Sequence, residues 1–260
     1  MLPNALADVK GLLLDLNGVF YVANRVLPGA LEAIAAIQKS GLPYRYATNN
    51  TTQSTQTMSH SLKAMGLPIE PTEIISASFA AVLHLRQMGT PAIYPLLTED
   101  AKQDFAEFPV SETNADVVVI GDMGDAWNYH RMNRAFRLIM QGAQLLALHR
   151  GKFWQWEAGL QLDIGAFVIG LEYATDQQAV VVGKPNPFFF KTAISNLNLP
   201  AAHVAMLGDD IEADVGGAQA AGMKGVLVKS GKYRPSLVDK VAVQPEAQID
   251  SVGAILDWFR

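Results

Sequence analysis

Short apolar runs that each end at a polar cluster recur along this chain. The runs cover residues 10–14, 44–47, 179–182 and 204–207, and the clusters behind them begin at Asp15, Thr48, Gly183 and Gly208. Apolar runs of this length, bounded by turn signals, are typical of buried strands. Between them, apolar residues recur at helical spacing near 31–40, 187–197 and 212–221. This alternation predicts an α/β fold built on a doubly wound parallel sheet.

The polar clusters are expected to lie together at one edge of that sheet. In an open α/β sheet, ligands bind outside the carboxyl ends of the strands. The clusters at 15–19, 48–50, 183–185 and 208–214 all follow a predicted strand, and a further strand is expected at 225–228. The sequence therefore predicts a single site assembled from segments about two hundred residues apart.

The segment between the second and third clusters is long enough to fold as a unit of its own. It contains strand-like runs at 92–97, 116–120 and 144–148 and a helix-like segment at 128–140. About a hundred residues is too long for a loop and suits a small domain. We expect an inserted α/β domain of residues 76–181 on a core formed by residues 1–75 and 182–260.

Composition excludes several classes of function. Half of the 260 residues are hydrophobic and 17% are charged, which fits a folded chain with a real core. The net charge of -5 offers no basic surface for nucleic acid or an anionic membrane. The absence of cysteine excludes disulfides, thiol nucleophiles, zinc-thiolate sites and iron–sulfur clusters. With no signal-peptide pattern and no apolar stretch of membrane-spanning length, we expect a soluble cytoplasmic protein.

The cluster at 208–214 holds four acidic residues in seven positions: Asp209, Asp210, Glu212 and Asp214. So many carboxylates repel one another unless they are solvated or bind a cation. Oxygen ligands without cysteine or grouped histidine favour Mg²⁺. The alternative is an ordinary helix N-terminus, where the dipole favours acids, but this explains one or two acids better than four.

A carboxylate beside Mg²⁺ can attack a phosphoryl group if other groups neutralise the charge that two anions bring together. Lys184 offers a positive charge, and Thr48 offers a hydroxyl followed by a turn with backbone N–H donors. Phosphoryl transfer depends mainly on positioning and electrostatics, so these groups suffice. The residues thus favour phosphoryl chemistry at Asp15.

The four clusters, in this order, resemble motifs I to IV of the haloacid dehalogenase (HAD) superfamily. The long insert is similar to the large cap of its subfamily IIA, which includes nitrophenyl phosphatase-like enzymes. The likeness extends over about residues 8–258 and includes the stretches 133–138, 171–176 and 216–219. It implies a HAD-like Rossmannoid core with an α/β cap, and a Mg²⁺-dependent phosphatase that forms an aspartyl-phosphate from a small phosphorylated substrate. It also implies a homodimer formed through the cap.

Carried over by position, the resemblance implies that Asp15 is the nucleophile and a Mg²⁺ ligand, assisted by Asn17 and Lys184. The metal residues it implies are Asp15, Asn17 through its carbonyl, Asp209, Asp210 and Asp214, of which the last two would hold metal-bound waters or Lys184. The phosphate-binding residues it implies are Asp15, Leu16, Asn17, Thr48, Asn49 and Lys184. It also places His149, Arg150 and the turn at 163–165 near the mouth of the cap.

Asn17 departs from the pattern that most phosphatases of this superfamily share. They carry a second aspartate there, which protonates the leaving oxygen and then activates water. An amide cannot exchange a proton at neutral pH, so this position lacks the general acid–base catalysis that raises the rate by about 10² to 10⁴-fold. We expect attack on good leaving groups to persist and dephosphorylation to be slow. A regulatory module that binds phosphate and Mg²⁺ without turnover is the main alternative, and a receiver-type phospho-acceptor, about half this length, is the weaker one.

Overall fold

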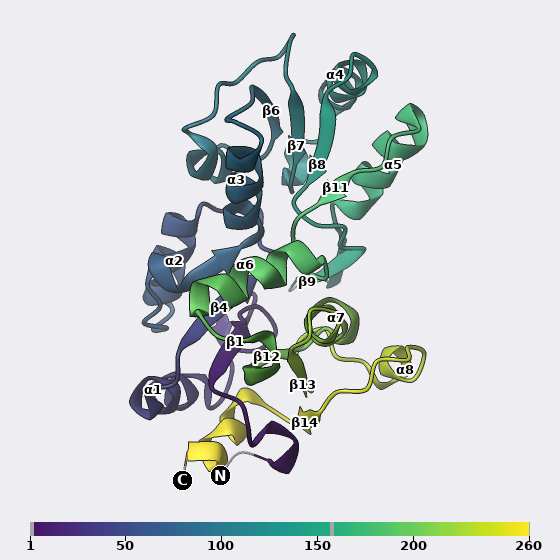
Figure 1. The fold of residues 1–260 in the computed structure, drawn as a ribbon. Helices are drawn as coiled ribbons and strands as arrows, with labels where there is room; N and C mark the ends of the chain where they lie inside the picture. Colours follow the sequence, from purple (N-terminus) through teal and green to yellow (C-terminus); the bar gives the residue numbers. More distant parts are fainter. Residues whose placement is uncertain (1–2, 157–158, 260) are drawn as a thin grey trace.

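The computed structural model describes residues 3–156 and 159–259, and most of the strands form two parallel sheets (Figure 1). The larger sheet has six strands in the order β14-β13-β12-β1-β4-β5, with all neighbours parallel. These strands are β1 (Gly11–Asp15), β4 (Tyr44–Thr48), β5 (Ile74–Ser76), β12 (Val204–Gly208), β13 (Lys224–Val228) and β14 (Ala247–Ile249). The chain builds one side from β1 to β5 and the other from β12 to β14. The strand order therefore reverses between β1 and β12, the place where open α/β sheets bind ligands.

Helices cover both faces of the larger sheet, as the sequence predicts. One face carries α1 (Ala30–Ser40), α2 (Thr55–Ala64) and the C-terminal 3₁₀ helix Val252–Phe259, and the other carries α3 (Ala77–Gln87), α6 (Pro187–Leu197) and α7 (Gly217–Ala220). Side chains alternate along a strand, so Leu12 and Leu14 of β1 enter the first apolar cluster and Leu13 enters the second. Every residue of β1 is buried, which explains its continuous apolar run.

Local capping sets the ends of several of these helices. Ser54 accepts a hydrogen bond from the Thr57 backbone N–H at the start of α2, and Asn186 caps α6, which has Pro187 in its first turn. Gly41 ends α1 in the left-handed conformation, where φ is 71°. These boundaries place the polar clusters in the connections that follow the strands.

The smaller sheet has four strands in the order β11-β8-β7-β6. They are β6 (Ile93–Leu96), β7 (Val117–Ile120), β8 (Gln144–Ala147) and β11 (Val180–Val181), and α4 (Tyr129–Met140) and α5 (Gly165–Thr175) cover one face. A hairpin of β9 (Phe153–Trp156) and β10 (Gly159–Leu162) follows β8, a second hairpin of β2 (Tyr21–Val22) and β3 (Arg25–Val26) follows β1, and α8 (Pro235–Val238) follows β13. The ranges predicted for β6, β7, β8 and α4 agree with the structure to within two residues at each end.

The strand before Lys184 lies in the smaller sheet, which corrects the expectation that the run at 179–182 shares an edge with the other three clusters. Val180 and Val181 pair with Leu146 and Ala147 of β8. Lys184 therefore reaches the larger sheet from the connection between the two sheets. Side-by-side pairing of so short a strand depends on tertiary contacts, which its own residues do not specify.

One apolar cluster joins the two sheets. It contains Leu13 and Met206 from the larger sheet, Val117 and Leu146 from the smaller sheet, and residues of α3 and α6 between them. Polar contacts reinforce this junction at the N-terminus of α2. The Ser54 N–H donates to Asp100 Oδ2 at 2.7 Å, and the Thr55 N–H donates to the Asp104 carboxylate at 3.1 Å. The carboxylates stabilise the N–H groups at this helix end, which have no partner within the helix.

Candidate active site

A cavity of about 1000 Å³ opens between the carboxyl ends of the two sheets. Asp15, Thr48 and Asp209 line it from the larger sheet, and Asp122 and His149, which follow β7 and β8, line it from the smaller one. Parallel strands whose carboxyl ends face a common cavity bring residues distant in sequence into one site. None of the helices built from the described residues is long and apolar enough to cross a bilayer.

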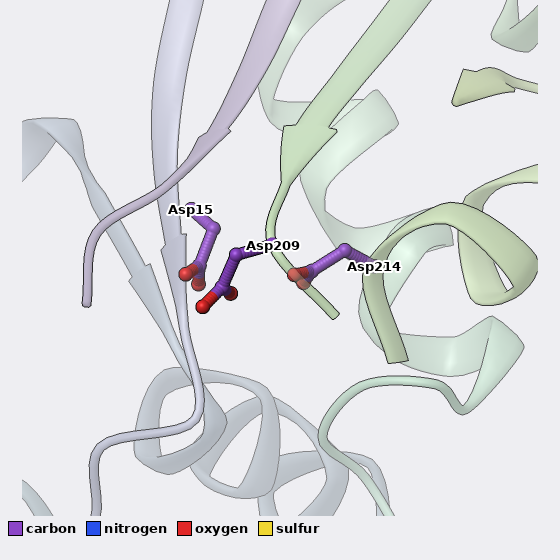
Figure 2. Close-up of side chains that lie close together, drawn as sticks. All are labelled: Asp15, Asp209 and Asp214. Atoms are coloured by element: carbon purple, nitrogen blue, oxygen red, sulfur yellow. The ribbon is translucent and has the colours of Figure 1, made fainter. Parts of the chain in front are cut away.

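Three buried carboxylates meet at the floor of this cavity (Figure 2). Asp15 ends β1, Asp209 follows β12, and Asp214 lies in a π-helical segment, Ile211–Gly216, that precedes α7. One carboxylate oxygen of each residue lies within 4.8 Å of the others. Among the described residues this is the one such group of potential metal ligands. Its donor chemistry suits a hard divalent cation.

Lys184 balances part of this negative charge. Its side chain is buried, and Nζ donates to Asp15 Oδ1 at 2.5 Å, to Asp214 Oδ1 at 2.7 Å and to the Ala47 carbonyl at 3.2 Å. These contacts use all three of the ammonium's N–H donors. Burial alone would lower the pKa of Lys184, but Asp15 and Asp214 outweigh burial and raise it. Lys184 therefore remains a cation between two carboxylates.

The carboxylates retain excess negative charge despite Lys184. Burial raises the pKa of Asp15 to about 7, although Lys184 opposes this and Asp214 adds to it. Burial also raises the pKa of Asp209 well above its ordinary value, with further contributions from Asp15 and Asp214. Uncompensated buried carboxylates hold protons unless a cation replaces them. The site is thus short of positive charge as it stands.

Asn49 and Thr48 hold the connection that follows β4. The Asn49 side chain makes two hydrogen bonds to the Lys184 backbone, donating to its carbonyl at 2.9 Å and accepting from its N–H at 3.0 Å. The Thr48 hydroxyl accepts from the Asn50 N–H at 3.1 Å. Thr48 and Asn49 line the cavity beside Asp15. Asn49, which follows a strand of the larger sheet, also holds the backbone of Lys184, which follows a strand of the smaller sheet.

Asp210 does not join the three grouped carboxylates. It lies at the N-terminus of the π-helical segment, where Oδ1 accepts from the backbone N–H groups of Glu212 and Ala213. Its own N–H donates to Asp214 Oδ2 at 3.1 Å. Asp214 thus accepts hydrogen bonds at both oxygens, from Lys184 and from Asp210.

The two residues after Asp15 differ sharply in exposure. The Leu16 side chain is fully buried in the apolar core beneath the sheet and does not line the cavity. Asn17 is exposed and forms part of the cavity wall. Whatever Leu16 contributes to ligand binding must therefore come from its backbone.

Lys232 is a cavity residue that the sequence analysis does not identify. Its backbone N–H donates to Asp209 Oδ2 at 2.6 Å, and its Nζ lies 3.7 Å from Asp210 Oδ2. Burial would lower the pKa of Lys232, but Asp210 and Asp209 raise it overall. The rule that ligands gather at strand ends, applied to the predicted strand at 225–228, is the signal that points to it.

His149 and Asp163 form a buried pair on the opposite wall. His149 Nδ1 accepts from the Gly151 N–H at 3.0 Å, so the ring proton resides on Nε2, which lies 3.7 Å from Asp163 Oδ1. Burial lowers the pKa of His149. The expectation that His149, Arg150 and the turn at 163–165 lie near the cap's mouth agrees with their position, since His149, Arg150 and Asp163 line the cavity.

Comparison with known proteins identifies the class. The family described as haloacid dehalogenase-like hydrolase matches residues 12–111, and a HAD-hydrolase-like family matches residues 181–255. The phospholysine phosphohistidine inorganic pyrophosphate phosphatase of Danio rerio is 38% identical over 97% of this chain and 94% of its own length. Haloacid dehalogenase-like hydrolase domain-containing protein 2 of Bos taurus is 38% identical over 96% and 95%. The chain belongs to the haloacid dehalogenase-like hydrolases.

Solved structures refine this assignment. A 4-nitrophenylphosphatase from Thermotoga maritima is 25% identical, with a TM-score of 0.92 over 99% of this chain and 100% of that one. NagD from E. coli K-12 is 23% identical and shares the fold, with a TM-score of 0.86 over 94% of this chain and 97% of its own. The resemblance to the HAD superfamily and to its subfamily IIA is thereby confirmed, and the chain is a HAD-type phosphatase.

Proposed function

We propose that this phosphatase acts on small phosphorylated compounds, requires Mg²⁺ and forms an aspartyl-phosphate on Asp15. The observation that carries the proposal is the unequal engagement of the two Asp15 oxygens. Lys184 holds Oδ1, whereas Oδ2 accepts no hydrogen bond from the described residues, in a side chain that lines the cavity. An oriented carboxylate with one free oxygen has the arrangement that a nucleophile needs.

Mg²⁺ fits the charge and chemistry of the three grouped carboxylates. We propose that Asp15, Asp209 and the Asn17 carbonyl are its protein ligands. Asp214 accepts from Lys184 and from the Asp210 N–H, so we propose that Asp214 acts chiefly by positioning Lys184. When bound, the ion supplies positive charge that lets a phosphoryl group approach Asp15.

In the proposed reaction, Asp15 Oδ2 attacks the phosphorus atom and forms a new P–O bond. The bond from phosphorus to the leaving group breaks, and the leaving group departs with the electron pair. Lys184, the Thr48 hydroxyl and the Asn49 backbone N–H stabilise the charge on the transferring oxygens. Water then attacks the phosphoenzyme, which releases phosphate and restores the carboxylate. Asn17 can donate a hydrogen bond in both steps but transfers no proton.

We further propose that residues 1–75 and 182–260 form the hydrolase core and residues 76–181 the cap. The smaller sheet, which forms the far wall of the cavity, lies within residues 76–181.

We also propose a homodimer formed through the cap. Ile169 and Tyr173 of α5 are 53% and 87% exposed and lie one helical turn apart. Sedimentation should then give about twice the chain mass of 28.1 kDa, and a monomer at micromolar concentration would contradict it.

Nitrophenyl phosphate with Mg²⁺ should give a burst of nitrophenol close to one equivalent of enzyme, followed by slow turnover. The burst reflects attack by Asp15 on a good leaving group, and the slow phase reflects hydrolysis without an acid–base residue at Asn17. Stopped-flow absorbance measures both phases, and an excess of EDTA should abolish them. Fast steady-state hydrolysis of alkyl phosphates would contradict slow dephosphorylation. No turnover with any small phosphate would favour the binding module instead.

The Asn17→Asp variant is expected to raise the rate of the slow phase. A carboxyl group there can protonate the leaving oxygen and accept a proton from water, so turnover should rise by up to about 10²-fold. Asn17→Ser is the matched control, because serine lacks this acid–base chemistry at neutral pH. The steady-state rates of the two variants with nitrophenyl phosphate are compared to test for proton transfer at residue 17. Equal rates would show that proton transfer at residue 17 does not limit turnover.

Mg²⁺ should raise the midpoint of thermal unfolding, and more at pH 8 than at pH 5.5. Burial raises the pKa of Asp15 from 3.8 to about 7, so the folded protein keeps a proton that the unfolded chain has lost. Stability of the metal-free protein therefore falls as the pH rises through that window. At pH 5.5 the ion must displace protons, whereas at pH 8 it meets free carboxylates.

With Mg²⁺ at about a hundred times its dissociation constant, we expect a shift of about 5–10 °C at pH 8. Less than half of that should remain at pH 5.5. Differential scanning fluorimetry against EDTA, with NaCl added to equal ionic strength, measures the difference. An equal or larger shift at pH 5.5 would contradict the assignment of these carboxylates as metal ligands.

A further inference from the structure

Lys232 is fixed to the reaction centre through its backbone. Its N–H donates to Asp209 Oδ2, and Ser230 Oγ donates to the Gly18 carbonyl. Gly231 has a φ of 49°, and a side chain at Gly231 or Gly18 would collide with the Asp209 carboxylate. The loop after β13 is therefore packed directly against Asp209. This contact fixes the Lys232 backbone beside Asp209.

The Lys232 ammonium has donors to spare, unlike Lys184. The carboxylate oxygen nearest to Nζ is Asp210 Oδ2, at 3.7 Å, which exceeds hydrogen-bond length. Within the described residues Nζ makes no hydrogen bond, although its side chain is only 35% exposed. Asp210 Oδ1 is already occupied by the helix N–H groups it caps. Lys232 therefore forms an ion pair with Asp210 without committing a hydrogen-bond donor to it.

The other cations that line the cavity are engaged or solvated. Arg150 donates to Glu172 at 2.8 Å, and Arg234 donates to the carbonyls of Gly231 and Tyr233. Lys152 is exposed to solvent. Lys232 thus combines a fixed backbone, a partly buried ammonium and free donors in a way that these residues do not.

The Thr48 hydroxyl and the turn after β4 already offer donors to the transferring phosphoryl group, and Lys184 offers it positive charge, so Lys232 is free for another anion. We propose that Lys232 binds a second anionic group on the substrate, carried by the leaving group, so that the site favours compounds of the diphosphate kind. This inference rests on the proposed phosphatase site, because the second group is defined relative to Asp15. An ammonium that is anchored through its backbone beside the reaction centre and keeps free donors selects such a compound by charge-assisted hydrogen bonds.

Methylenediphosphonate and inorganic phosphate provide the test, because neither requires turnover. Calorimetric titration at one fixed free Mg²⁺ concentration gives the ratio of their dissociation constants. The wild type should prefer the diphosphonate, and Lys232→Met should lose at least about tenfold of that preference, as expected for one charge-assisted contact. Lys232→Gln provides a second neutral variant, and Lys232→Arg should keep most of the preference. A purely structural role would weaken both ligands equally.

Lys229→Met is the matched control. Lys229 lies three residues earlier, pairs with Asp250 at the surface and does not line the cavity, so the ratio should be retained. In kinetic terms, the ratio of kcat/KM for pyrophosphate to that for nitrophenyl phosphate should fall by at least about tenfold in Lys232→Met. An unchanged ratio, or a wild type without preference for the diphosphonate, overturns the inference. Absence of Asp15-dependent hydrolysis would instead overturn the proposed function, and the titrations separate the two.

Discussion

The Asp15→Asn variant should lose at least about 10³-fold in turnover while remaining folded. The amide has the size of the carboxylate but cannot form an acyl phosphate, so covalent catalysis ends at the first step. Initial rates with nitrophenyl phosphate measure the loss. Rapid acid quenching with a radiolabelled substrate should detect a hydroxylamine-sensitive phosphoenzyme in the wild type and none in the variant.

Folding of this variant follows from the electrostatics of the site. Asp15 is one of three buried carboxylates, and burial raises its pKa to about 7 because its charge is poorly compensated. Removing that charge relieves repulsion, so the metal-free variant should unfold at the wild-type temperature or above. Asp250→Asn makes the same chemical change at an exposed position and should keep wild-type activity. If Asp15→Asn retained a tenth of the activity, Asp15 would not be the nucleophile.

Lys184→Met should cost about 3–5 kcal/mol of unfolding free energy at pH 8 in the absence of metal. The substitution leaves Asp15 and Asp214 buried without their shared cation and removes the donor to the Ala47 carbonyl. The loss should be smaller at pH 5.5, where the carboxyl groups can take up protons instead. Activity should fall by at least about 10³-fold, because the transferring phosphoryl group loses its positive partner.

Urea unfolding with EDTA at the two pH values measures this difference in stability. Lys191→Met is the control, since Lys191 lies exposed on α6 and its substitution should change stability by less than about 0.5 kcal/mol. A Lys184→Met protein as stable as the wild type at pH 8 would mean that the two carboxylates find other compensation. The cation between them would then have no structural role.

The positions of Asp15, Thr48 and Asp209 could be predicted because each stands at or just beyond the end of a strand in the larger sheet. The pattern of apolar runs defines those ends, and the topology of parallel sheets brings them to one edge. The same reasoning expects Lys184 beside Asp15, where the structure places it, but it assigns the preceding strand to the wrong sheet. Its preceding strand pairs with β8, and a choice between two sheets depends on packing that a two-residue strand does not encode.

Asp210 shows a second kind of limit. The resemblance implies that it is a metal residue, yet it is the N-cap of the π-helical segment and lies apart from the three grouped carboxylates. Acidic residues at a helix start serve both capping and metal binding, and composition does not separate the two uses. Lys232 escaped prediction because its place in the cavity depends on one loop conformation, set by Gly231 against Asp209.

The apolar cluster shared by the two sheets bears on how substrate enters. Swinging the smaller sheet away would expose several side chains, each worth about 1.5–3 kcal/mol when buried, and would break the carboxylate contacts at α2. Such a junction resists a hinge motion between the two sheets. We therefore expect substrate to enter a cavity whose width changes little. Compact phosphorylated metabolites should then reach Asp15 more readily than phosphorylated side chains of folded macromolecules.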